Sequence, residues 1–324
     1  MSTSASEMRN AYTNALEKPL DWSTGLSEAD FERLTEDWNA YALVAPEDLE
    51  PRPPTRGNPQ RPFQSLMYEI RPDVLKRHRL HNHVMLGGHG LDEPVPRTAP
   101  VWTLVWGHWY ATIGDMTLVM VDIVAARERG ATKGEVGQWL ALASLQNGNT
   151  GINNAGYVVD RYMRAWAADD GAPGLPWPDG WRSDVDVFRS GVDFEAFDES
   201  RLQDDVELIR DWYRRWQGEV PAFVDLWGAE FPLVLRAFRA RWETIMDGPL
   251  PAQMIVLLQL DLAAKWNQPA AVCRLMRMAK KLGVPKGMVV QLLAFSQLLL
   301  GDIRMDASLP GVKEILASWG ESAS

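Results

Sequence analysis

Cysteine is nearly absent from this sequence, with Cys273 the single example in 324 residues. One thiol cannot form an intrachain disulfide, and it cannot supply the Cys-x-x-Cys pair of a redox enzyme or the thiolates of a cysteine-rich zinc site. Cys273 lies within an apolar helical pattern, which favours an inert packing role. Dithiol chemistry by one chain is therefore excluded.

The chain also lacks an excess of basic residues. It has 33 Lys and Arg against 43 Asp and Glu, and its formal net charge is −10. Nonspecific binding to nucleic acid or to anionic lipid needs clustered basic side chains. We therefore expect neither a nucleic acid nor a membrane as partner. No apolar run reaches the roughly 20 residues of a membrane-spanning helix, and residues 1–20 lack the apolar core of a secretory signal. We expect a cytoplasmic protein.

Strict alternation of apolar and polar residues, the pattern of half-buried strands, is not found either. Apolar residues recur instead at spacings of three and four within about 64–168 and 203–320. That spacing is typical of helices. Hydrophobic residues make up 46% and charged residues 23% of the chain, as in ordinary globular proteins. The predicted fold class is all-α.

Two proline-rich stretches divide the chain. Six prolines fall within 46–62, a density that no helix or central strand tolerates. Residues 1–66 are therefore predicted to form short helices and an extended arm. Prolines and glycines also open a predicted linker over 171–202. Helical blocks are predicted on either side of it, at 67–170 and 203–324.

The two helical blocks resemble each other in sequence. Residues 126–136, ARERGATKGEV, align with residues 279–289, AKKLGVPKGMV, 153 positions later. In each copy a helix ends at a glycine, a short turn follows, and Thr132 or Pro285 begins the next helix. We interpret this pattern as a tandem duplication.

The first copy also resembles a known family. A helix that ends in Ala-x-x-x-Gly-Ala-Thr at 126–132, followed by a charged turn and a Leu-Ala-Leu-Ala helix at 140–143, is similar to the carboxymuconolactone decarboxylase and alkylhydroperoxidase D superfamily. The resemblance covers 67–168 as a whole domain and 223–305 more faintly. It implies two tandem helical repeats, a homo-oligomer and a small-molecule substrate.

The chain departs from the family at the redox residues. The thiol-dependent branch carries Cys-x-x-Cys-x-x-x-His in the helix before the Gly-Ala-Thr motif. The matching positions here hold Asp115, Leu118 and Asp122, and the second copy has Gln, Ala and Leu there. The resemblance therefore implies a scaffold and leaves the reaction open.

All five histidines are close in sequence, at His78, His81, His83, His89 and His108. Imidazole transfers protons near neutral pH and binds first-row metals. Three interpretations stay open: surface histidines at a helix end, an acid–base site that uses His81, His89 or His108, and a metal site. On a helix that stops at Gly87–Gly88, at most two of the first three histidines face one metal. No cofactor is expected, and a metal is the alternative.

Asp115 and Asp122 lie seven residues apart in an apolar stretch and so share one helix face. A carboxylate in such a place pairs with a cation, caps a helix, or has a raised pKa suited to acid–base chemistry. Asp115 follows Gly114 and is a candidate N-cap or a catalytic acid. Asp122 stands where the family has its histidine, and its alternatives are catalysis and a structural pair with an arginine.

Two further segments contain candidate substrate-binding residues. Residues 146–157, QNGNTGINNAGY, are dense in amides and glycines. They form either two helix-joining turns or a set of donors for a developing oxyanion. Trp102 and Trp106 lie on one helix face and form either core or an aromatic wall for a flat substrate. The candidate substrate-binding residues are Asn149, Asn153, Asn154, Tyr157, Trp102 and Trp106.

Together with the family resemblance, these residues predict a thiol-independent and cofactor-independent enzyme of small-molecule catabolism. The expected reaction is that of a lyase, a decarboxylase or a C–C hydrolase on a ring-derived or carbonyl-bearing acid. Asp122 or His108 would serve as general base or acid, and Asn149 with Asn153 would stabilise the oxyanion. Two alternatives remain: a catalytically silent binding or assembly protein of the same fold, and a metal-dependent enzyme that uses the histidines of 78–108.

Overall fold

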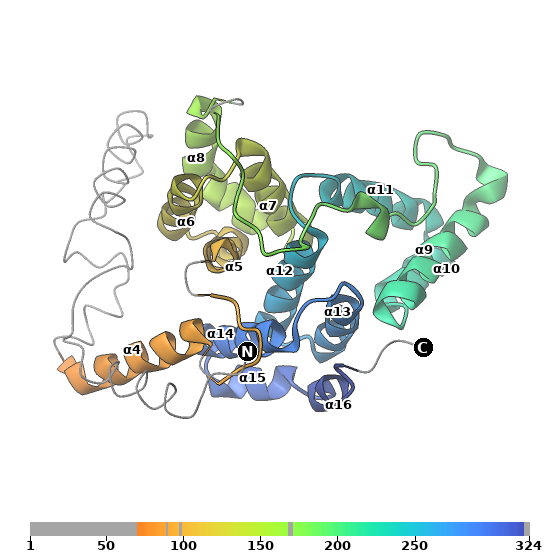
Figure 1. Cartoon of the computed structure of the whole chain (residues 1–324). Coiled ribbons are helices and arrows are strands. Elements are labelled where there is room, and N and C mark those ends of the chain that lie inside the picture. The colour runs from red at the N-terminus through yellow and green to blue at the C-terminus, as the bar shows by residue number, and fades with distance from the viewer. Residues whose placement is uncertain (1–69, 89, 97–98, 168–170, 321–324) are drawn as a thin grey trace. The chain divides into compact units, whose positions relative to one another are not determined.

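The computed structural model describes residues 70–88, 90–96, 99–167 and 171–320. These residues form helices joined by turns, and none of them belongs to a strand (Figure 1). The all-α prediction is confirmed for this part of the chain. The helices and proline-rich arm predicted for 1–66 lie outside it. None of the described helices has the length and apolar character needed to cross a membrane.

The chain separates into two units, Met1–Trp177 and Pro178–Ser324. The first unit contains α4 (Pro72–Gly87), α5 (Pro100–Ile113), α6 (Met116–Glu128), α7 (Lys133–Gln146) and α8 (Asn149–Ala165). Helix α5 is the centre of this unit, because it packs against α6, α7 and α8 and nearly all of its residues are buried. The core of the first unit therefore surrounds α5.

Two glycines allow the helices around α5 to approach closely. A Cβ on Gly107 would lie 2.2 Å from the ring of Trp139 on α7 and 2.8 Å from the Cβ of Asp122 on α6. A Cβ on Gly151 of α8 would lie 1.9 Å from the carbonyl oxygen of Thr112. Real Cβ atoms do not come so close to other heavy atoms, so the packing around α5 depends on glycine at both positions.

The buried carboxylate of Glu135 joins α7 to the segment that follows α8. Thr132 is the N-cap of α7, and its side chain and that of Glu135 form a capping box. The same carboxylate accepts hydrogen bonds from the backbone N–H of Leu175 and from the indole N–H of Trp177. The stretch predicted as a linker is thus divided, with residues up to Trp177 in the first unit and residues from Pro178 in the second.

The second unit contains more elements, with α12 at its centre. They are η1 (Val185–Val187), η2 (Glu199–Arg201), α9 (Leu202–Gln217), α10 (Ala222–Glu230), α11 (Pro232–Met246), α12 (Ala252–Lys265), α13 (Pro269–Lys281), α14 (Lys286–Leu300), α15 (Asp302–Ser308) and α16 (Val312–Ala317). Helix α12 packs against α13, α14 and α15, and almost every one of its residues is buried. Its place matches that of α5 in the first unit.

A buried arginine fixes α9 against α11 in the second unit. The guanidinium of Arg239 lies 4.1 Å from the ring centroid of Trp212 and 4.0 Å from that of Trp242. Its Nε donates to Glu243 at 2.7 Å, and its Nη2 donates to the carbonyl of Phe188. The charge is therefore held between two aromatic faces and compensated by a carboxylate, as a buried cation requires.

The helix boundaries of the two units correspond. Helices α6, α7 and α8 begin at Met116, Lys133 and Asn149, and α13, α14 and α15 begin 153 residues later in each case. Helices α4 and α11 both start with proline in the first turn, and the residue before each has the same φ of −149°. The starts of α6, α7 and α8 therefore keep the 153-residue offset of the sequence alignment, whereas α4 and α11 start 160 residues apart.

The turns between these helices correspond as well. The residue after α5, Gly114, has a φ of 76°, and Asn267, which stands 153 positions later, has a φ of 53°. Gly148 and Gly301 precede α8 and α15 with φ, ψ of 68°, −170° and 79°, 178°. Residues 100–148 and 253–301 thus have the same local backbone over three helices and their turns.

Candidate functional site

His108 lies in the middle of α5 and has no exposed surface. Helices α6, α7 and α8 pack around α5, so the imidazole is enclosed in the core of the first unit. Among the candidate histidines its position contrasts with that of His81, which is exposed on α4. His89 lies outside the described residues. Of the described candidates, His81 is thus exposed to solvent and His108 is enclosed.

The metal alternative has no ligand set in the described residues. Within that part of the chain, no group of three or more His, Cys, Asp or Glu side chains is arranged to hold a metal ion. The helix that carries His78 and His81 ends at Gly87, as predicted, and Gly88 caps it with a φ of 62°. His78 and His81 thus belong to α4, whereas His108 belongs to α5.

Asp122 is buried on α6, with 9% of its surface exposed. Its Cβ lies against the backbone of Gly107, the residue that precedes His108 on α5. Asp122 and His108 therefore come from two packed helices at the same level of the first unit. They are the two ionisable candidates that the structure places in this core.

Asp115 is the N-cap of α6. Its side chain accepts a hydrogen bond from the backbone N–H of Leu118 at 2.9 Å, which satisfies one of the free donors at the start of the helix. Of the roles considered for this carboxylate, the structure shows the cap.

The amide-rich segment is mostly helical. One turn at Asn147–Gly148 joins α7 to α8, and α8 begins at Asn149, so the alternative of two successive turns is wrong. Asn147 donates from its side chain to the carbonyl of Thr112 at 2.7 Å and ties the end of α5 to this turn. Sequence reasoning missed the helix because Asn and Gly disfavour helices locally, whereas the packing of Gly151 on α5 requires a small residue.

The candidate amides face away from the buried histidine. Asn149, Asn153 and Asn154 are all exposed on α8, and the side chain of Asn154 lies beside Gly114. Tyr157 belongs to α8, but its side chain lies outside the description. The exposed amides and the enclosed imidazole of His108 therefore do not form one open surface.

The aromatic face of α5 is divided between core and surface. Trp102 is buried, as the core interpretation predicts. Trp106 is partly exposed and stacks on Tyr110, with ring centroids 5.9 Å apart. Of these two tryptophans, Trp106 is therefore the one with surface that a ligand could reach.

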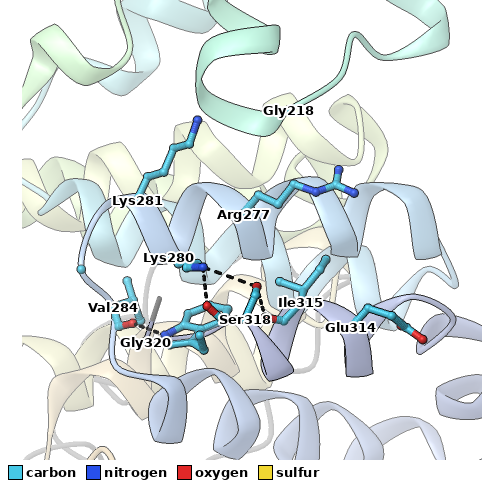
Figure 2. A pocket seen from close by; sticks show the side chains of 11 residues that line it. Gly218, Arg277, Lys280, Lys281, Val284, Glu314, Ile315, Ser318 and Gly320 are labelled. Carbon is cyan, nitrogen blue, oxygen red and sulfur yellow. Dashed lines mark hydrogen bonds between the residues drawn. The ribbon is translucent and has the colours of Figure 1, made fainter. Parts of the chain in front are cut away.

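A pocket that the sequence did not predict lies in the second unit (Figure 2). It has a volume of about 740 Å³ and is bordered by the C-terminal ends of α9, α13 and α16. Its cationic lining residues all come from α13 and are Arg277, Lys280 and Lys281. Glu314 is the one acidic residue among those that line it. Its apolar lining residues include Val284, Ile315 and Trp319.

Each of these cations donates to a carbonyl near a helix end. Lys280 donates to the backbone carbonyl of Ser318 (Figure 2), and Lys281 donates to that of Arg215. Arg277 donates to the carbonyl of Gln217 at 3.4 Å. Carbonyls in the last turn of a helix lack partners within the helix and carry partial negative charge, so the basic end of α13 stabilises the ends of α9 and α16.

No family model, no curated protein and no solved structure matches the chain.

Proposed function

We propose that this chain is a thiol-independent enzyme built from two copies of a helical unit that resembles the carboxymuconolactone decarboxylase and alkylhydroperoxidase D superfamily. Its reaction is that of a lyase, a decarboxylase or a C–C hydrolase on a ring-derived or carbonyl-bearing acid. One observation supports this proposal above others: the two units share a local backbone, yet they place different ionisable side chains in their cores.

In the second unit the buried charges neutralise each other. Asp261 stands 153 residues after His108, and its carboxylate accepts from Lys265 at 2.6 Å and from Ser296 at 2.8 Å. Neither side chain of the ion pair has exposed surface. Burial raises the pKa of Asp261 and lowers the pKa of Lys265, while their pairing acts in the opposite sense. Such a closed network is typical of a structural core.

In the first unit the corresponding positions hold different side chains. His108 replaces Asp261, and Thr112 replaces the lysine. Asp122 stands where the second unit has Leu275. An imidazole and a carboxylate on adjacent helices have different intrinsic pKa values, and such pairs serve as general acid and general base. We assign these roles to His108 and Asp122. Asn149 and Asn153 are exposed on α8, and we assign them no part in this pair.

The experiment measures turnover of a panel of ring-cleavage acids by the purified chain. We expect at least one acid to be consumed, and we expect Asp122→Asn and His108→Gln each to lower kcat by about 100-fold or more, the usual contribution of a general acid or base. Asp160→Asn is the matched control, because this exposed carboxylate pairs with Arg164 on the surface of α8. Unchanged turnover by Asp122→Asn would remove that residue from the mechanism.

A second candidate function is that of a catalytically silent binding or assembly protein of the same fold. It is favoured by the complete enclosure of His108 and by the capping role of Asp115. Calorimetric titration with the same acids separates the two functions. Binding without turnover supports the silent protein, whereas turnover supports the enzyme. Elemental analysis of the untagged protein tests the metal-dependent alternative, which requires a near-stoichiometric first-row metal.

A further inference from the structure

We propose that the pocket at the C-terminal end of α13, called here the α13 pocket, binds a small organic anion with an acidic group and an apolar body. The pocket belongs wholly to the second unit. The proposal is therefore independent of the chemistry assigned to the first unit. It rests on charge, on free donor capacity, on an apolar wall and on a comparison with the first unit.

The lining of the α13 pocket is positive within a chain that is negative overall. Arg277, Lys280 and Lys281 face a single acidic lining residue, Glu314, whereas the net charge of the chain is −10. No described carboxylate forms an ion pair with either lysine. Arg277 approaches Glu219 only at 3.9 Å. The positive charge of the pocket is therefore largely available to a ligand.

The lysines also retain hydrogen-bond donors. An ammonium has three donors. The ammonium of Lys281 donates to one carbonyl, and that of Lys280 donates to the carbonyl and the hydroxyl of Ser318. These bonds hold both side chains at the ends of neighbouring helices and leave each ammonium a donor for a carboxylate, sulfonate or phosphate oxygen. A cation that is held in place loses less conformational entropy when it binds an anion.

An apolar wall completes the α13 pocket. Trp319 donates from its indole N–H to the carbonyl of Val284 at 3.1 Å, which sets the orientation of the ring. Val284 and Ile315 also line the pocket (Figure 2). A volume of about 740 Å³ lies within the range of small-molecule sites, which combine apolar walls with a few placed polar groups. The lining therefore selects an acid with an apolar body over a bare inorganic anion.

The backbone shared by the two units does not require the cations that line the pocket. The positions of Arg277 and Lys281 are occupied in the first unit by Val124 and Glu128. The position of Lys280 is occupied by Arg127, whose guanidinium lies 4.8 Å from the ring centroid of Trp166 and donates to a tyrosine hydroxyl. Two of the three cations that line the pocket, Arg277 and Lys281, therefore have no cationic counterpart in the first unit.

The test uses the fluorescent sulfonate 1-anilinonaphthalene-8-sulfonate with the full chain. We expect saturable binding, weakened about tenfold or more in Arg277→Gln/Lys281→Gln, because a charge-assisted hydrogen bond is lost at each position. Lys286→Gln/Lys313→Gln is the matched control, since it removes the same charge from α14 and α16 at positions that do not line the pocket. The neutral analogue N-phenyl-1-naphthylamine should be insensitive to both double variants.

A second variant keeps the test decisive if the loss of two cations loosens α9. Glu314→Gln removes the acidic lining residue at an exposed position of α16, and we expect it to tighten binding of the sulfonate severalfold. The proposal is overturned if the sulfonate does not bind saturably. It is also overturned if its affinity is the same in the wild type, in Arg277→Gln/Lys281→Gln and in Glu314→Gln.

Discussion

The central helices of the two units, α5 and α12, have equivalent neighbours and the same pattern of burial, but they contain different polar groups. Helix α12 carries a carboxylate and an ammonium that neutralise each other. Helix α5 carries one imidazole, and Asp122, the other buried ionisable candidate, is on the next helix, α6. A shared local backbone therefore does not determine how a core accommodates buried charge. The outcome depends on which side chain stands one helical turn further along the same helix.

Removal of one partner of the buried pair should have the largest effect. In Lys265→Met the carboxylate of Asp261 loses its 2.6 Å partner while it remains without exposed surface. We expect a loss of about 3–5 kcal/mol in the free energy of unfolding. Urea unfolding followed by circular dichroism measures this change.

The double variant Asp261→Leu/Lys265→Met sharpens the comparison. It replaces the pair by apolar side chains and should fall within about 1 kcal/mol of the wild type or be more stable, because no buried charge is left unpaired. A double variant as unstable as Lys265→Met would contradict this account of the second core.

Adding a methyl group where α5 packs closely against α6 and α7 should have the next largest effect. In Gly107→Ala the added Cβ meets the ring of Trp139 and the Cβ of Asp122, and we expect a loss of about 1–3 kcal/mol from overpacking. Gly137→Ala is the matched control on α7, since a Cβ at that position meets nothing within 4 Å. The control should gain about 0.5–1 kcal/mol, because alanine is the better helix former. Equal effects of the two substitutions on the urea midpoint would show that the close approach is absent.

The smallest effect concerns Cys273, which stands where the first unit has Met120. The thiol is buried and donates to the carbonyl of Pro310 at 3.4 Å, and burial raises its pKa. The unfolded thiol ionises near pH 8.5, so the unfolded state loses its proton first. Stability from this group is therefore complete below about pH 8.5 and is lost as the pH rises toward the higher pKa of the folded state.

Two measurements check this expectation. The wild type should lose slightly more stability than Cys273→Met between pH 8 and pH 10 in urea unfolding. Modification of the native thiol by a disulfide reagent at pH 8 should be slower than modification in urea. Rapid modification of the native protein would contradict the inert role of this cysteine.

Much of the helical organisation could be predicted because its signals are local. The glycine turn at Gly130, the cap at Thr132 and the proline at Pro285 each specify a helix boundary through the backbone of a few residues. The helix start at Asn149 was missed because its signal is not local. Gly151 is suited to α8 through its contact with the carbonyl of Thr112, which is distant in sequence.

The candidate site could be predicted only as a set of residue types. The clustering of the histidines in sequence indicated one site, but the loop between α4 and α5 separates exposed His81 from enclosed His108. The spacing of Asp115 and Asp122 predicted that both lie on one helix face, but α6 begins at Met116, and Asp115 precedes it as the N-cap. The spacing could not show that Asp115 is used as a cap, whereas Asp122 packs against Gly107.

The sequence by itself determined that the described residues are helical, that α7 and α14 begin after Thr132 and Pro285, and that one chain cannot perform dithiol chemistry. These properties follow from short-range backbone preferences and from composition. The tertiary structure alone decided which ionisable groups are buried, which partner each one has, and where the α13 pocket lies. That pocket is bordered by the ends of α9, α13 and α16, which end at Gln217, Lys281 and Ala317. Only packing brings these ends together, because no local preference links residues so far apart along the chain.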